Sequence, residues 1–141
     1  MMDNSVGILL VEDDEVDVMN VQRSFKRTHI NNPLYIASDG IQALELLHLK
    51  GSEKLNPFPK LILLDINMPR MNGIEFLQEL RSDPELKHLT VIMLTTSNEE
   101  RDIVAAYDFN VAGYILKPVD IDDFIKAISA MDMYWSLCQL P

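Results

Sequence analysis

The chain has 141 residues and a formal net charge of −10, from 22 acidic and 12 basic side chains. This acidity, with a pI near 4.6, argues against a surface for nucleic acid or anionic membranes, because both need clustered lysine and arginine. The length fits a single domain over residues 1–141, and one cysteine, no signal peptide and no apolar stretch near the ~20 residues of a membrane span indicate a cytoplasmic protein.

Short apolar runs alternate five times with stretches of helical periodicity. In chain order, we expect a strand at residues 6–11, a helix at 14–29, a strand at 34–37, a helix at 39–49, a strand at 60–65, a helix at 72–83, a strand at 89–94, a helix at 98–109, a strand at 113–116 and a helix from 120 onward. The stretch 50–59 contains Gly51, Pro57 and Pro59 and is expected to be an unusually long loop. Alternating strands and helices predict a parallel sheet with helices on both faces.

Polar residues at the expected helix starts predict N-terminal caps. Asp120 is expected to cap the last helix, and Asp14 places a favourable negative charge at the start of the first. Three pairs have the spacing of a capping box, in which side chains and backbone bond reciprocally: Asp39 with Gln42, Asn72 with Glu75, and Ser97 with Glu100.

Chemically active side chains follow four of the expected strands. Glu12 and Asp13 follow the first strand, Asp65 ends the third, Thr95 follows the fourth and Lys117 follows the fifth. Because the carboxyl ends of parallel strands meet at one edge of a sheet, these groups are expected to converge. Clustered carboxylates repel one another unless a cation lies between them, and an oxygen-rich cluster suits Mg²⁺. Taken alone, Asp65 is also explained as a turn residue at a strand exit, but its partners favour a functional site.

Five sequence blocks resemble, in order and spacing, the receiver domain of the response-regulator family, the CheY-like phosphoacceptor half of two-component signalling. The resemblance covers about residues 6 to 130 and implies a doubly wound (βα)5, flavodoxin-like α/β fold with a five-stranded parallel sheet in the order 2-1-3-4-5. It also implies a cis Lys117–Pro118 peptide bond. The matching blocks are Val11-Glu12-Asp13-Asp14, Leu64-Asp65-Ile66-Asn67-Met68-Pro69 with Asn72-Gly73, Leu94-Thr95-Thr96, Gly113-Tyr114 and Lys117-Pro118.

The resemblance implies that Asp65 is phosphorylated and that Mg²⁺ is the cofactor. Asp13 and Asp65 match direct ligands of the metal, and the backbone carbonyl of Asn67 matches a third. Glu12 matches an acid that usually contacts the metal through a water molecule, although its longer side chain leaves direct ligation open.

Three further positions match residues that assist or respond to phosphorylation. Lys117 matches the amine that pairs first with the acceptor carboxylate and then with the phosphoryl group. Thr95 matches the hydroxyl that contacts the phosphoryl group; Thr96 is the competing candidate, and the end of the apolar run favours Thr95. Tyr114 matches an aromatic that moves together with that hydroxyl, and without the resemblance we would interpret it as a surface ring.

The function implied by the resemblance is that of a stand-alone response regulator. It would take a phosphoryl group from the phosphohistidine of a sensor histidine kinase or a phosphotransfer protein onto Asp65. It would not be an enzyme beyond catalysing its own phosphorylation and dephosphorylation. Phosphorylation would change the face formed by the fourth helix, the fifth strand and the fifth helix, and a downstream protein would bind that face.

The C-terminal tail, residues 131–141, stays apolar beyond the part of the last helix that its core needs. With the long loop at 50–59, this tail resembles the small regulators that partner bacterial phytochrome-type kinases. Its apolar side chains are expected either to mediate a homodimer or to fold back on the same domain.

Two alternatives remain open on the sequence. A haloacid-dehalogenase-like phosphatase also uses an aspartate after a buried strand, but it needs a second aspartate two residues later, where this chain has Asn67. A degenerate receiver that acts only as a scaffold is disfavoured because every expected site residue is present.

Overall fold

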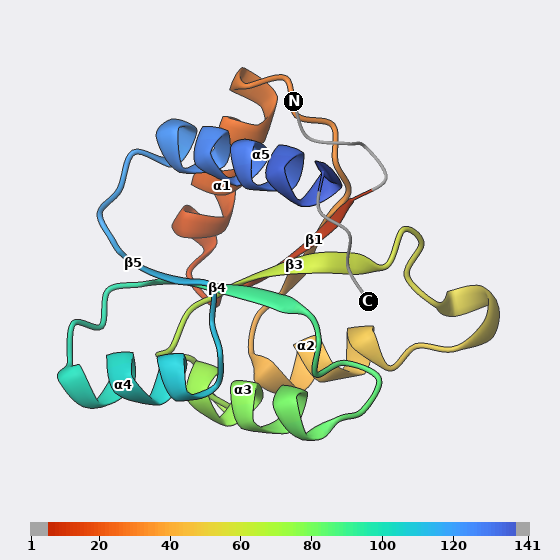
Figure 1. Ribbon diagram of the computed structural model, residues 1–141, viewed down its shortest axis with the longest axis vertical. Helices are drawn as coiled ribbons and strands as arrows, with labels where there is room; N and C mark the ends of the chain where they lie inside the picture. Colours follow the sequence, from red (N-terminus) through yellow and green to blue (C-terminus); the bar gives the residue numbers. More distant parts are fainter. Residues whose placement is uncertain (1–5, 138–141) are drawn as a thin grey trace.

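The structure is a computed structural model that describes the backbone of residues 6–137 and the side chains of residues 6–127, 129 and 130. Its centre is a sheet of five parallel strands in the order β2-β1-β3-β4-β5, which confirms the expected topology (Figure 1). The strands are β1 (Gly7–Val11), β2 (Leu34–Ala37), β3 (Pro59–Leu64), β4 (Thr90–Thr95) and β5 (Gly113–Leu116).

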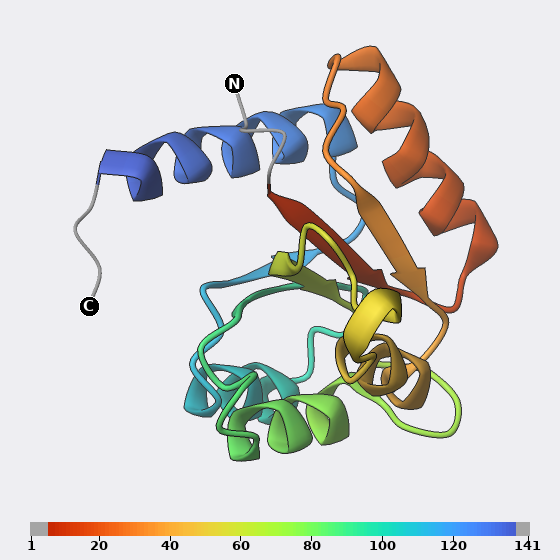
Figure 2. The same ribbon diagram turned by 90° about the vertical axis from the view of Figure 1, so that its right-hand side faces the viewer.

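Helices cover both faces of this sheet (Figure 1 and Figure 2). One face carries α1 (Glu15–Arg27) and α5 (Ile121–Leu137), which contact each other. The other face carries α2 (Gly40–Leu47), α3 (Gly73–Ser82) and α4 (Glu100–Asp108). A short 3-10 helix, η1 (Gly51–Glu53), interrupts the expected loop at 50–59. The arrangement is the doubly wound, flavodoxin-like α/β fold expected from the sequence.

Alternate residues of the strands fill two hydrophobic cores, one on each face of the sheet. In β1, Leu9 and Val11 belong to the core beneath α2, α3 and α4, whereas Ile8 and Leu10 belong to the core beneath α1 and α5. All four side chains are buried. Because both faces are covered, the central strands are continuous apolar runs, which is why they could be located in the sequence.

Side-chain caps define the starts of α1, α2 and α3. Asp14 and Asp39 accept backbone N–H groups from the first turns of α1 and α2, and Asn72 and Glu75 form the predicted reciprocal capping box at α3. At α2 the predicted box is only half formed, because the Gln42 side chain accepts the backbone N–H of the residue before Asp39.

The predicted capping box between Ser97 and Glu100 is wrong. Helix α4 begins at Glu100 with Glu99 as its N-cap, and no side chain caps it. The hydroxyl of Ser97 instead donates to Asp102 Oδ2 at 2.6 Å, and its backbone contacts two residues of the candidate site. The hydroxyl of Ser97 is therefore occupied by the Asp102 side chain and does not accept a backbone N–H as a cap.

The backbone has unusual geometry at several places between the helices and strands. His29 has a left-handed φ of 57° and lies beyond the end of α1 at Arg27, so this helix is shorter than expected. The Lys117–Pro118 peptide bond is cis, as the resemblance implies. The Asn56–Pro57 bond is also cis, which the sequence did not indicate.

Helix α5 continues to Leu137 and so extends into the predicted tail. Asp120 Oδ1 accepts the N–H of Asp123 at 3.2 Å, which confirms its predicted capping role. The last turns of α5 extend past the edge of the sheet (Figure 2). The side chains of the tail, including Cys138, lie outside the described residues, so the expected homodimer contact remains a prediction.

Candidate functional site

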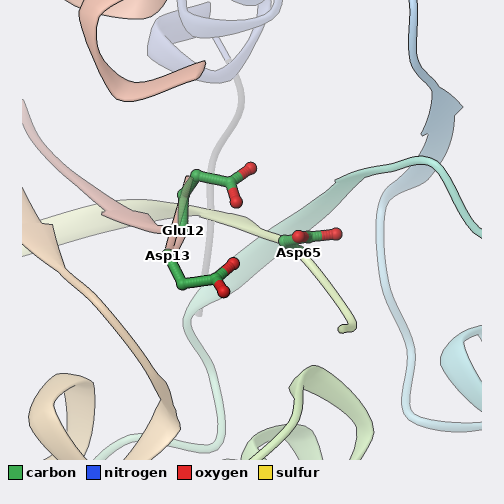
Figure 3. A group of neighbouring side chains, drawn as sticks. All are labelled: Glu12, Asp13 and Asp65. Carbon is green, nitrogen blue, oxygen red and sulfur yellow. The ribbon is translucent and has the colours of Figure 1, made fainter. Parts of the chain in front are cut away.

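Three carboxylates meet at the carboxyl edge of the sheet. Glu12 and Asp13 follow β1, Asp65 follows β3, and carboxylate oxygens of the three lie within 4.8 Å of one another. Figure 3 shows the carboxylates of Glu12 and Asp13 on the side that faces Asp65. Glu12 and Asp65 are buried, whereas Asp13 is exposed. The structure thus brings together the acids that the sequence predicted, in a donor set suited to a hard divalent cation.

Asp65 is held by its neighbours through both its backbone and its side chain. Its N–H donates to Val11 O at 3.1 Å, which continues the contact between β3 and β1. Its Oδ1 accepts the N–H of Ile66 at 2.8 Å. A Cβ atom on Gly73, at the start of α3, would lie 2.1 Å from the Asp65 carbonyl oxygen, so a larger residue does not fit there. These contacts give the Asp65 carboxylate a defined position beside the other two acids.

Glu12 ionises less easily than an ordinary glutamate. Burial raises the pKa of Glu12 to about 7; the hydrogen bond from Lys117 opposes this rise, and the negative charge of Asp65 adds to it. Glu12 Oε2 also accepts the N–H of Asp14 at 3.2 Å. The site therefore concentrates negative charge that a divalent cation would neutralise.

Lys117 lies beside this cluster but does not pair as expected. Its ammonium donates to Glu12 Oε1 at 2.5 Å and to Asp17 Oδ2 at 2.7 Å, and its side chain is 11% exposed. Burial acts to lower the pKa of Lys117, but the hydrogen bonds to Asp17 and Glu12 outweigh it and the pKa is raised. The expected pairing with the Asp65 carboxylate is thus replaced, among the described residues, by two other acids. Sequence reasoning did not identify Asp17. An acid in the first turn of a helix is ordinarily explained by its favourable interaction with the helix dipole, so nothing marked this residue as part of the site.

Thr95 and Tyr114 are connected through Ser97. Thr95 ends β4 with its side chain fully buried, and its Oγ1 accepts the N–H of Ser97 at 3.2 Å. The competing candidate Thr96 is exposed. Tyr114, in β5, is half-buried and donates its hydroxyl to Ser97 O at 2.7 Å; burial raises the pKa of this phenol. The sequence indicated Thr95 and Tyr114, but the residue that links them was assigned to a helix cap.

The loop that carries Asn67 is anchored to α2. Arg70 in this loop has a left-handed φ of 62° and donates to both carboxylate oxygens of buried Asp39, at 2.7 and 3.1 Å. The backbone N–H of Gly40 donates to Met71 O in the same loop. Asn67 is exposed and lines a polar groove of about 550 Å³ between the β3–α3 and β4–α4 loops. Metal binding by its carbonyl stays a prediction.

A comparison with family models decides the assignment. The response regulator receiver domain matches residues 8–129. The chain belongs to this family. Its members are signalling regulators, and the assignment therefore disfavours the phosphatase alternative.

In the described part of this receiver domain, no helix is long and apolar enough to cross a membrane.

Similar proteins include response regulators of known structure, one of them a phytochrome response regulator. Response regulator Rcp1 of Synechocystis sp. is 38% identical over 128 residues, which cover 91% of this receiver domain and 87% of that protein. A crystal structure of the Mn(2+)-bound form of Rcp1 matches with a TM-score of 0.77 at 37% identity, covering 96% of this chain and 99% of that one. The phosphorylated cyanobacterial phytochrome response regulator RcpA matches with a TM-score of 0.78 at 33% identity, covering 96% and 98%.

Proposed function

We propose that this receiver domain accepts a phosphoryl group on Asp65 from the phosphohistidine of a sensor histidine kinase or a phosphotransfer protein. The observation that carries the proposal is the convergence of the Glu12, Asp13 and Asp65 carboxylates within 4.8 Å. Half-buried Lys117 and buried Thr95 lie at neighbouring strand ends. A carboxylate beside a cation site is a competent nucleophile for phosphoryl transfer.

In this transfer an oxygen of the Asp65 carboxylate forms the bond to phosphorus while the nitrogen–phosphorus bond of the donor breaks and the imidazole leaves. Asp13, Asp65 and the carbonyl of Asn67 would hold Mg²⁺, with Glu12 contacting it through a water molecule. When bound, the cation supplies positive charge that neutralises the phosphoryl oxygens. The spacing of the three carboxylates and the burial of Glu12 support this assignment.

After transfer, Lys117 and Thr95 would bind the phosphoryl oxygens. Thr95 Oγ1, which accepts the N–H of Ser97 in the present structure, would then move toward the phosphoryl group and donate its hydroxyl proton to it. Because Tyr114 is bonded to the carbonyl of the same serine, a change at Thr95 would reach Tyr114 in β5. Phosphorylation would in this way shift the equilibrium between two arrangements of the β4–α4 loop.

The output would be contact between the α4–β5–α5 face and a downstream protein. Three large apolar side chains of this face are exposed: Val104 by 52%, Tyr107 by 50% and Leu116 by 44%. Exposed apolar side chains from neighbouring elements are suited to protein contact. The name of RcpA, a phytochrome response regulator, supports a phytochrome-type kinase as the phosphodonor, and we retain the tail at 131–141 as a candidate homodimer contact.

Labelling by a small phosphodonor tests the acceptor assignment. Wild type, Asp65→Asn and the exposed control Asp108→Asn would be incubated with acetyl phosphate and Mg²⁺ and measured by intact mass. We expect wild type and the control to gain one phosphoryl group and Asp65→Asn to gain none. Equal labelling of all three proteins would refute Asp65 as the acceptor, and an unlabelled wild type would favour the degenerate scaffold.

A further inference from the structure

The ammonium of Lys117 is held by two carboxylates from different elements. Glu12, at the end of β1, lies 2.5 Å away, and Asp17, in the first turn of α1, lies 2.7 Å away. The side chain of Asp17 is 35% exposed, whereas that of Glu12 is 4% exposed. Lys117 is thus hydrogen-bonded to one acid of the carboxylate cluster, Glu12, and to one acid outside that cluster, Asp17.

The start of α1 does not require a carboxylate at position 17. Asp14 already caps this helix, accepting the backbone N–H groups of Val16 and Asp17. The Asp17 side chain instead reaches Lys117, which is 100 residues away in the chain. Together these two side chains form part of the wall of a cavity of about 300 Å³ between α1 and the segment that joins β5 to α5, which is also lined by Asn20, Val21, Thr96, Pro118 and Val119.

A bound cation would act differently on the two partners of Lys117. Glu12 belongs to the cluster whose oxygens converge within 4.8 Å, so a divalent ion there, even when it contacts Glu12 through a water molecule, draws on the negative charge of this carboxylate and weakens its pairing with Lys117. Asp17 is not part of that cluster and keeps its charge free for Lys117. In the metal-loaded protein, Asp17 is therefore the acid that remains to hold the ammonium on the α1 side of the site.

We infer that Asp17 is a positioning residue that competes with the phosphoryl group on Asp65 for Lys117. The inference rests on the proposed phosphorylation of Asp65. Lys117 gives up part of its interaction with Asp17 when it moves to the phosphoryl oxygens, so the Lys117–Asp17 ion pair stabilises the resting protein more than the transition state. Removing an interaction that is stronger in the ground state increases the rate of the reaction.

The test compares rates of phosphorylation by acetyl phosphate at saturating Mg²⁺. Asp17→Asn removes the charge with little change of shape, and Glu15→Gln removes one charge from the same turn at an exposed position. We expect Asp17→Asn to react about 1.4- to fivefold faster than wild type, the range that follows from losing a partly exposed ion pair. Glu15→Gln should match wild type, and Asp17→Glu should restore its rate.

A second background separates positioning from a general effect on α1. The measured quantity is the affinity for beryllofluoride, a phosphoryl mimic. If Asp17 acts through Lys117, Asp17→Asn will raise this affinity when Lys117 is present. In the Lys117→Gln background, Asp17→Asn will leave the affinity unchanged. An equal gain in both backgrounds, or equal rates for Asp17→Asn and Glu15→Gln, would overturn the inference. A wild type that neither reacts with acetyl phosphate nor binds the mimic would overturn the proposed function and the inference with it.

Discussion

Replacing Glu12 with glutamine should remove much of the pH dependence of stability in the metal-free protein. The pKa of this carboxyl is 4.5 in its ordinary state and about 7 in the folded protein, chiefly because the group is buried. The unfolded chain therefore releases the proton at a lower pH than the folded chain does. Glutamine has a similar shape and carries no titrating proton, so it isolates this contribution.

The sign of the effect follows from proton linkage. Below pH 4.5 both states hold the proton and Glu12 carries no penalty. Between pH 4.5 and 7 the unfolded state has lost the proton and the folded state keeps it, so the free energy of unfolding falls by up to about 1.4 kcal/mol per pH unit as pH rises. Above pH 7 the free energy of unfolding stops falling, after a total loss of about 3 kcal/mol. This loss is a sizeable share of the ~5–15 kcal/mol that stabilises a typical domain.

Urea denaturation of the metal-free protein, followed by circular dichroism across this pH range, measures the effect. Wild type and the control Glu79→Gln, at an exposed position of α3, should lose stability as pH rises, while Glu12→Gln should lose about 3 kcal/mol less. Only the slopes are compared, because glutamine also changes the contact with Lys117 independently of pH. Parallel curves for Glu12→Gln and wild type would refute the assignment of this titration to Glu12.

Two further predictions address the switch and the stability of the fold. Thr95→Ala should still be labelled at Asp65, but the NMR shifts of Ser97 and Tyr114 on binding beryllofluoride should disappear, because the Thr95 hydroxyl that links the phosphoryl site to Ser97, and through Ser97 to Tyr114, is gone; shifts equal to those of wild type would contradict the coupling. Arg81→Met should lower the free energy of unfolding by about 3 kcal/mol relative to the exposed control Arg23→Met, because a charged side chain that donates to four backbone carbonyls is lost. Equal denaturation midpoints for the two arginine variants would contradict that role.

The strands and most helix starts could be predicted because their signals are local. A strand buried on both faces must be apolar at every position, as in Leu61 to Leu64, which are at most 1% exposed. The capping box of Asn72 and Glu75 lies within four residues of sequence and was predicted correctly. The strand order is not a local property, and it was available only from the resemblance to a known family.

The partners of the site residues could not be predicted, because they come from distant parts of the chain. The acids and Lys117 were expected at one edge of the sheet, since each follows a parallel strand. The choice of Asp17 over Asp65 as a partner of Lys117 depends on where α1 lies relative to β5, and no spacing in the sequence encodes that distance. Arg81 was missed for the same reason, since its carbonyl partners lie up to 29 residues away.

Ser97 shows how one misassigned residue bears on the mechanism. Its N–H donates to Thr95, its carbonyl accepts from Tyr114, and its hydroxyl donates to Asp102 in the first turn of α4. In the proposed mechanism Thr95 turns toward the phosphoryl group, and the N–H of Ser97 then needs a new acceptor because a buried donor is costly to leave unpaired. Satisfying it requires the β4–α4 loop to move. Since the same residue holds β5 and α4, that movement reaches two of the elements that expose Val104, Tyr107 and Leu116.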